Sequence, residues 1–259
     1  MIQPNETIRP SITQAQQTVA KVVGLLYLIQ MALAIFGESF VRNRLIVPRD
    51  AVQTAANIVA SERLFRVSLA GDLMIYASVV VLFWGIYIIL KPVNKEVALL
   101  GAFFRLIEQA ILAVTTFAGF IALRLLSDVE YLRTIDTAQL QALARAFLSM
   151  YGIGLSIGFV FLGLGSAVFS YVWLQSRYIP RAIAYLGIFA SLLLTVMTLV
   201  TMVFPAVWQR IGMAYMMPMG LYEVGLGVWL LIKGLREPAG SQRPTLNVQR
   251  PTSKPENSV

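Results

Sequence analysis

Residues 73–90 have the sequence LMIYASVVVLFWGIYIIL, which contains no charged side chain. A helix needs about 20 mainly apolar residues to cross the hydrocarbon core of a bilayer. Extended to 66–90, this segment is one of six comparable stretches, and the other five lie near residues 19–40, 97–126, 147–175, 181–205 and 211–235. The sequence therefore predicts an all-α fold, a polytopic transmembrane bundle of six helices.

The composition excludes a soluble domain. Of the 259 residues, 58% are hydrophobic and 13% are charged, whereas a typical soluble domain is roughly 45–50% apolar and about 25% charged. The chain also contains no Cys and no His. Their absence excludes disulfides, thiol catalysis, zinc sites built on these residues and a His general base. We therefore expect neither a metal site nor a cofactor.

The six spans leave two polar tails and place both ends of the chain on one side of the membrane. We expect residues 1–18 to form an N-terminal tail, 19–236 the transmembrane domain and 237–259 a disordered C-terminal tail rich in Pro, Ser, Gln and Asn. The even-numbered helices end in aromatic residues followed by a basic residue, as in Trp84 and Lys91 or Trp229 and Lys233. Such endings favour the cytoplasm, so both termini are predicted to be cytoplasmic.

The first and third loops each predict a short amphipathic helix on the non-cytoplasmic side. Asp50 follows Pro48 as a candidate N-cap, and apolar residues recur behind it at helical spacing. Asp136 is a similar candidate in the third loop, where Leu140 and further apolar residues follow. Helices five and six have only a short link around Pro205. We interpret the two loop helices as connectors with a packed face, and a lid or partner surface is the alternative.

Ionisable residues inside the spans are the main candidates for function. Four of them form a candidate polar centre: Asp72, Arg105, Glu108 and Glu223. Three more are placed at the outer mouth of the bundle: Glu38, Arg42 and Arg66. Charges within a bilayer are costly, so each of these residues suggests a binding site by default. Arg105 and Glu108 are three residues apart and therefore share one helix face.

These charges allow two interpretations. In a structural polar core, Arg105 pairs with Glu108 or Glu223, and Asp72 pairs with Arg66 or with a hydroxyl group. In a functional site, the carboxylates outnumber Arg105, the one deeply placed cation, so an unpaired carboxylate would take up a proton, a cation or a cationic ligand. No catalytic residue is assigned, because the chain has no His to activate a hydroxyl group.

The fourth predicted helix is rich in glycine, and Gly154 and Gly158 form a G-x-x-x-G spacing. Such a spacing permits two helix backbones to approach closely. We interpret both glycines as helix-packing positions within the chain, and a homodimer seam is the alternative. The start of the sixth helix carries four methionines around Pro218, which favours lipid or helix contact over an adaptable wall for an apolar ligand.

An ordered series of short motifs runs along the chain. They are GLLY at 24–27, RNRLIVP at 42–48, LAGDL at 69–73, LKPVNK at 90–95, FFRL at 103–106, YGIG at 151–154 and SRYIPR at 176–181. Together they resemble the bacterial domain-of-unknown-function family 4386 over about residues 19–236. The resemblance implies a six-helix integral membrane protein of the bacterial cytoplasmic membrane, with no established activity. Relatives often carry a His near the Tyr-Gly motif, where this chain has Met150.

Three functions are compatible with this pattern. The leading hypothesis is a non-enzymatic membrane module that binds or moves a small apolar or cationic solute at the polar centre. The alternatives are a scaffold or partner subunit that associates through the fourth helix, and a lipid-modifying enzyme that acts from carboxylates such as Asp72 or Glu108. The expected partners are the lipid bilayer, a small-molecule or cation ligand and a second copy of the chain. Nucleic acid is not expected, because the basic residues are scattered along the membrane margins.

Overall fold

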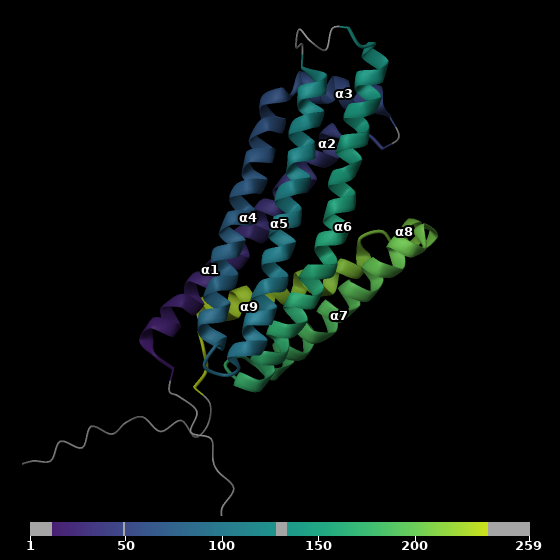
Figure 1. The fold of residues 1–259 in the computed structure, drawn as a ribbon. Helices are drawn as coiled ribbons and strands as arrows, with labels where there is room; N and C mark the ends of the chain where they lie inside the picture. The colour runs from purple at the N-terminus through teal and green to yellow at the C-terminus, as the bar shows by residue number, and fades with distance from the viewer. Residues whose placement is uncertain (1–11, 49, 128–133, 238–259) are drawn as a thin grey trace, which may run out of the picture.

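A computed structural model of the chain describes residues 12–48, 50–127 and 134–237, and within these residues every regular element is a helix. Figure 1 shows their arrangement. In chain order they are α1 (Gln14–Phe36), the π-helix η1 (Gly37–Arg42), α2 (Asn43–Leu45), α3 (Ala51–Ala60), α4 (Glu62–Leu90), α5 (Lys95–Leu126), α6 (Thr137–Ser176), α7 (Arg181–Val203), α8 (Pro205–Ile211), the 3-10 helix η3 (Ala214–Met216) and α9 (Met217–Ile232).

The six predicted spans are confirmed. Six helices are long and apolar enough to cross a membrane: Gln14–Leu45, Glu62–Leu90, Lys95–Leu126, Thr137–Ser176, Arg181–Val203 and Ala214–Ile232. The first span begins earlier than the predicted residue 19, because Thr13 and Gln16 form a capping box that starts the helix at Gln14. The chain is therefore a multi-pass membrane protein. Most of the two predicted tails falls at residues 1–11 and 238–259, outside the described residues.

The two loop helices differ from each other in the structure. The first is present as α3, and Asp50 caps it by accepting a hydrogen bond from the Gln53 backbone N–H at 2.8 Å. In the third loop, Asp136 caps a helix as expected. This helix is α6 itself, which runs without a break from Thr137 to Ser176. The prediction of a separate short helix in the third loop was therefore wrong. The reason is that residues 137–151 contain no Gly or Pro to interrupt the helix.

The hydrophobic core has two parts at opposite ends of the bundle. Helices α4, α5 and α6 run side by side, α3 lies at one end of them, and α7 and α9 lie towards the other end (Figure 1). The larger part, around Trp173 and Tyr222, draws on all six spans. The smaller part, around Ile58 and Phe65, is formed by η1, α2 and α3 against the ends of α4, α5 and α6. Each part lies next to its own group of buried charges.

Candidate functional site

The structure separates the predicted polar centre into two groups of charged residues. Asp72 lies about 27 Å along α4 from the α4–α5 turn, whereas Arg105 lies about 15 Å along α5 from the same turn. We name the first group the Arg42 cluster, which consists of Glu38, Arg42, Asp72 and Tyr151. The second group, the Arg105 cluster, consists of Arg105, Glu108, Ser166 and Glu223. Asp72 therefore lies with Glu38 and Arg42, which were predicted for the outer mouth, and not with Arg105 and Glu108.

The Arg42 cluster is held together by one guanidinium. Arg42 Nε contacts Glu38 Oε2 at 2.8 Å, and Arg42 Nη1 contacts Asp72 Oδ2 at 2.9 Å. The Tyr151 hydroxyl donates a longer hydrogen bond to the same Asp72 oxygen at 3.5 Å, and the Arg42 Cζ atom lies 4.8 Å from the centre of the Tyr151 ring. Arg42 thus joins η1 to α4 and α6.

Sequence reasoning missed the role of Arg42 because it depends on the π-helix. A π-helical turn contains more residues than an α-helical turn, so the residues after Gly37 are rotated around the axis relative to a continuous α-helix. This rotation accompanies the burial of Val41 and the inward position of Arg42. Arg66, the expected partner of Asp72, instead forms an exposed pair with Glu62 at 2.7 Å. Of the two partners predicted for Asp72, Arg66 was wrong, whereas a hydroxyl group, that of Tyr151, does bond to it.

The Arg105 cluster contains the pair that the helical spacing predicted. Arg105 Nη1 lies 3.0 Å from Glu108 Oε2, and both side chains are 3% exposed. Nη1 also donates long hydrogen bonds to Ser166 Oγ at 3.4 Å and to the Leu162 carbonyl at 3.5 Å. The guanidinium carbon lies 3.9 Å from the centre of the Phe83 ring, a close cation–π contact.

Glu223 is a buried carboxylate that forms no ion pair within residues 12–48, 50–127 and 134–237. Its residue is 8% exposed, and no Lys or Arg nitrogen of the described residues lies within 4.0 Å of it. The carboxyl group of Glu223 interacts electrostatically with Arg105 without contacting it. Tyr27 on α1 is also within electrostatic range of Glu223, Arg105 and Glu108. The Arg105 cluster therefore has two carboxylates around one guanidinium, and only one of them is in direct contact with it.

The Arg105 cluster contains buried polar atoms that have no hydrogen-bond partner among the described residues. Within the described residues, the buried side-chain atoms without a hydrogen-bond partner are Gln30 Oε1, Arg105 Nε, Glu108 Oε2, Gln109 Oε1, Trp173 Nε1 and Trp229 Nε1. Glu108 Oε2 is among them because its contact with Arg105 has the distance of an ion pair but not the geometry of a hydrogen bond. The Arg42 cluster contributes no atom to this group. Buried polar atoms in membrane proteins are usually satisfied, so the Arg105 cluster is the candidate binding region.

Glycines on α6 explain how Arg105 is accommodated. A Cβ atom at Gly165 would lie 2.8 Å from Arg105 Cγ and 2.9 Å from Arg105 Cδ. Further along α6, Gly154 and Gly158 face Thr115 and Leu112 of α5. These two glycines therefore serve packing within the chain, as predicted. Their buried faces are not available for a homodimer seam in this structure.

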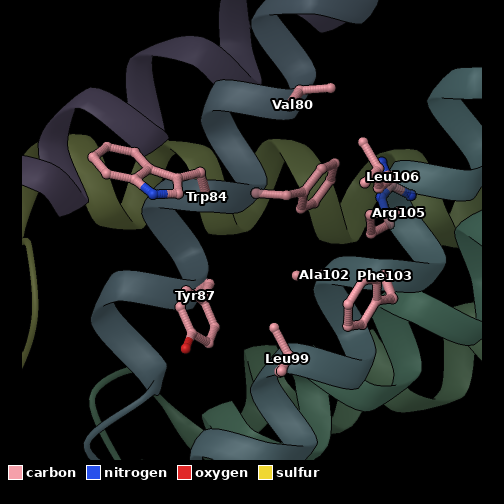
Figure 2. A pocket seen from close by; sticks show the side chains of 9 residues that line it. Val80, Trp84, Tyr87, Leu99, Ala102, Phe103, Arg105 and Leu106 are labelled. Atoms are coloured by element: carbon pink, nitrogen blue, oxygen red, sulfur yellow. The ribbon is translucent and has the colours of Figure 1, made fainter.

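A pocket lies between α4 and α5 next to the Arg105 cluster. It has a volume of about 270 Å³ and is lined by Val80, Phe83, Trp84, Tyr87, Leu99, Ala102, Phe103, Arg105 and Leu106. Figure 2 shows the labelled side chains of α4 on one side of the pocket and those of α5 on the other. Trp84 and Phe103 are 61% and 54% exposed on the outside of two membrane spans. The pocket therefore opens sideways, towards lipid.

Ala102 is the small residue in the lining of this pocket, and it lies opposite the aromatic residues of α4 (Figure 2). The sequence does not single it out, because Ala98 and Gly101 close to it are also small. The methionines that suggested an apolar wall are elsewhere, in η3 and α9 and just before them. In the part of the chain that the structure describes, no three acidic residues are placed to hold a metal ion.

Comparison with known proteins identifies a family but no activity. No curated protein and no solved structure matches the chain. The model of a domain of unknown function, DUF4386, matches residues 22–234, which includes both charged clusters and all six spans except the first residues of α1. With most of its length matched, and with the six-helix architecture that the motifs implied, this chain belongs to the DUF4386 family.

Proposed function

We propose that this protein is a non-enzymatic module of the bacterial cytoplasmic membrane that binds a small, mainly apolar solute in the pocket between α4 and α5, with both termini in the cytoplasm. The observation that carries the proposal is an apolar pocket that opens towards lipid and reaches a buried arginine. A volume of about 270 Å³ is close to the lower end of the range of roughly 300–1,000 Å³ found for small-molecule sites.

The lining favours an apolar solute over a cationic one. Arg105 is the charged residue in the pocket wall, and the other lining residues are aliphatic or aromatic. A cation in this pocket would meet the positive guanidinium first. Glu223, the carboxylate best suited to a cation, does not line the pocket.

The two alternative functions have less support from the geometry. A scaffold that associates through Gly154 and Gly158 would need their faces to be free, but α5 covers both. An enzyme that acts from Asp72 or Glu108 would need a carboxylate free to exchange protons with a substrate. Asp72 is bound by Arg42 and Tyr151, and Glu108 is paired with Arg105.

Filling the pocket tests the proposal. We expect ethylnaphthalene, a neutral aromatic probe, to raise the thermal unfolding temperature of the protein in lipid nanodiscs, because a ligand that binds the native state stabilises it. Ala102→Phe should abolish this stabilisation by occupying the pocket. Ala110→Phe is the matched control, since Ala110 is exposed on α5 outside the pocket, and it should respond as the wild type does. An equal response of all three proteins, or no response of the wild type, would overturn the proposal.

A further inference from the structure

We infer that the solute bound between α4 and α5 is a neutral, membrane-dissolved molecule with a hydrogen-bond acceptor oxygen, such as a carbonyl, which enters from the side and accepts a hydrogen bond from Arg105. This inference rests on the proposed function and names the chemistry of its ligand. Four observations support it: the unused donor of Arg105, the charge around it, its position inside a membrane span and the residues of the lining.

The first observation concerns the donors of Arg105. A guanidinium carries five N–H groups and accepts no hydrogen bond. The contacts of Arg105 with Glu108, Ser166 and Leu162 all use Nη1. Its Nε is buried and has no acceptor among the described residues. A buried donor without an acceptor is unfavourable. Arg105 lines the pocket, so a ligand oxygen that bonds to its guanidinium would recover part of this loss.

The charge of the surroundings selects a neutral acceptor. Arg105 is already paired with Glu108 at 3.0 Å, and Glu223 lies within electrostatic range of it. An anionic ligand would add a third carboxylate-like charge around a single guanidinium, in a region of low dielectric where like charges repel strongly. A cationic ligand would be repelled by Arg105 itself. An uncharged carbonyl oxygen avoids both costs.

The position of Arg105 favours a ligand dissolved in the bilayer over a phospholipid headgroup as the source of that oxygen. Arg105 lies about 15 Å from the start of α5, a helix of 32 residues that is about 48 Å long and exceeds a hydrocarbon core of about 30 Å. Arg105 is therefore inside the span, and its side chain is only 3% exposed, so a bulky headgroup has little access to it. A ligand that enters from the side must be soluble in the hydrocarbon core as a whole molecule, including its acceptor group.

The lining favours a compact or ring-shaped molecule. Trp84, Tyr87 and Phe103 are aromatic residues of the lining, and the Phe83 ring lies next to the guanidinium. Aromatic rings stack against one another with centroids about 4.5–7 Å apart. A flat carbonyl compound could therefore contact these rings while its oxygen points to Arg105.

A matched series of naphthalene derivatives tests the chemical class. The probes are acetylnaphthalene with a neutral carbonyl, naphthoate with a carboxylate, naphthylmethylammonium with a cation and ethylnaphthalene without an acceptor. Each is added to the wild-type protein in nanodiscs at equal mole fraction in the lipid, and its affinity is obtained from the shift in thermal unfolding. We expect acetylnaphthalene to bind about tenfold more tightly than each of the other three, as one hydrogen bond to a charged donor predicts.

Arg105→Lys provides the second arm of the test. Lysine keeps the positive charge beside Glu108 but lacks the Nε donor and the planar guanidinium. The advantage of acetylnaphthalene over ethylnaphthalene, measured for both probes in the same variant, should disappear. If this variant does not fold, the probe series on the wild type decides the question.

The outcomes separate this inference from the proposed function. If ethylnaphthalene binds as tightly as acetylnaphthalene, or if naphthoate or the ammonium probe binds best, the inference is overturned and the apolar pocket stands. If no probe stabilises the wild type, the proposed function itself fails. A tenfold preference for the ketone that Arg105→Lys removes would support both.

Discussion

The Arg42 cluster and the Arg105 cluster have the same charged groups but use them differently. Each contains one arginine and two carboxylates. Arg42 contacts both of its carboxylates, Glu38 and Asp72, whereas Arg105 contacts only Glu108. Among the described residues, buried polar atoms without partners occur in the second cluster and not in the first. The comparison indicates that the Arg42 cluster joins helices and that the Arg105 cluster retains capacity for a ligand.

The surroundings of the second carboxylate differ as well. The side chain of Glu38 is 37% exposed, so water or lipid headgroups can solvate its charge. Glu223 is buried in α9 and lacks an ion pair with any described residue. Burial of an unpaired carboxylate is unfavourable. The Arg42 cluster is therefore expected to contribute more to stability than the Arg105 cluster, and substitutions in and beside the two clusters test how they differ.

The largest effect is expected for Arg42→Met. The substitution leaves the buried Asp72 without its cation, and breaking a buried pair in this way costs roughly 3–5 kcal/mol. The free energy of unfolding, measured in mixed detergent micelles, should fall by about this amount. Arg66→Met is the control, because the exposed pair of Arg66 and Glu62 is expected to contribute less than about 1 kcal/mol. Equal effects of the two substitutions would show that the Arg42 cluster does not hold the helices together.

An intermediate effect is expected for Gly165→Ala. The added methyl group would lie within 3 Å of the Arg105 side chain, and overpacking of this kind costs about 1–3 kcal/mol. Displacement of Arg105 should also weaken the stabilisation by acetylnaphthalene. Gly152→Ala is the matched control on the same helix, since nothing lies within 4 Å of its added Cβ. It should be neutral or stabilising by up to about 1 kcal/mol. A destabilisation by Gly152→Ala as large as that by Gly165→Ala would contradict the contact with Arg105.

The smallest effect is expected for Glu223→Gln. Glutamine keeps the shape of the side chain and removes a carboxyl group that has no ion pair with a described residue, so the free energy of unfolding should change by less than about 1 kcal/mol. Asp72→Asn makes the equivalent change in the Arg42 cluster. It should cost about 1.5–3 kcal/mol, because it replaces a hydrogen bond between two charged groups with a weaker one. If Glu223→Gln lowered the free energy of unfolding more than Asp72→Asn, the carboxylate that stabilises the fold through a charged partner would be Glu223 and not Asp72.

Much of the fold could be predicted from local sequence. The six spans follow from runs of apolar residues, and the caps at Asp50 and Asp136 follow from residue type and position. The pairing of Arg105 with Glu108 follows from their separation along one helix. All of these features depend on residues that are close together in the chain. The extra length of α6 could have been predicted too, from the absence of Gly and Pro between residues 137 and 151.

Two features of the candidate site could not be predicted in this way. Arg42 reaches Asp72, thirty residues away, through a π-helix whose position the apolar pattern does not reveal. The pocket requires Ala102 and Leu99 of α5 to lie opposite Trp84 and Tyr87 of α4. That register depends on how the two helices rotate and tilt against each other.

The sequence by itself determined that this chain crosses the membrane six times, and it restricted the available chemistry to carboxylates and arginines, because hydropathy and residue type are local properties. Only the tertiary structure decided which arginine meets which carboxylate. It also decided where polar groups stay unpaired, and where two helices leave room for a ligand. These contacts join residues on different helices, and packing across the whole bundle sets the orientation of each helix.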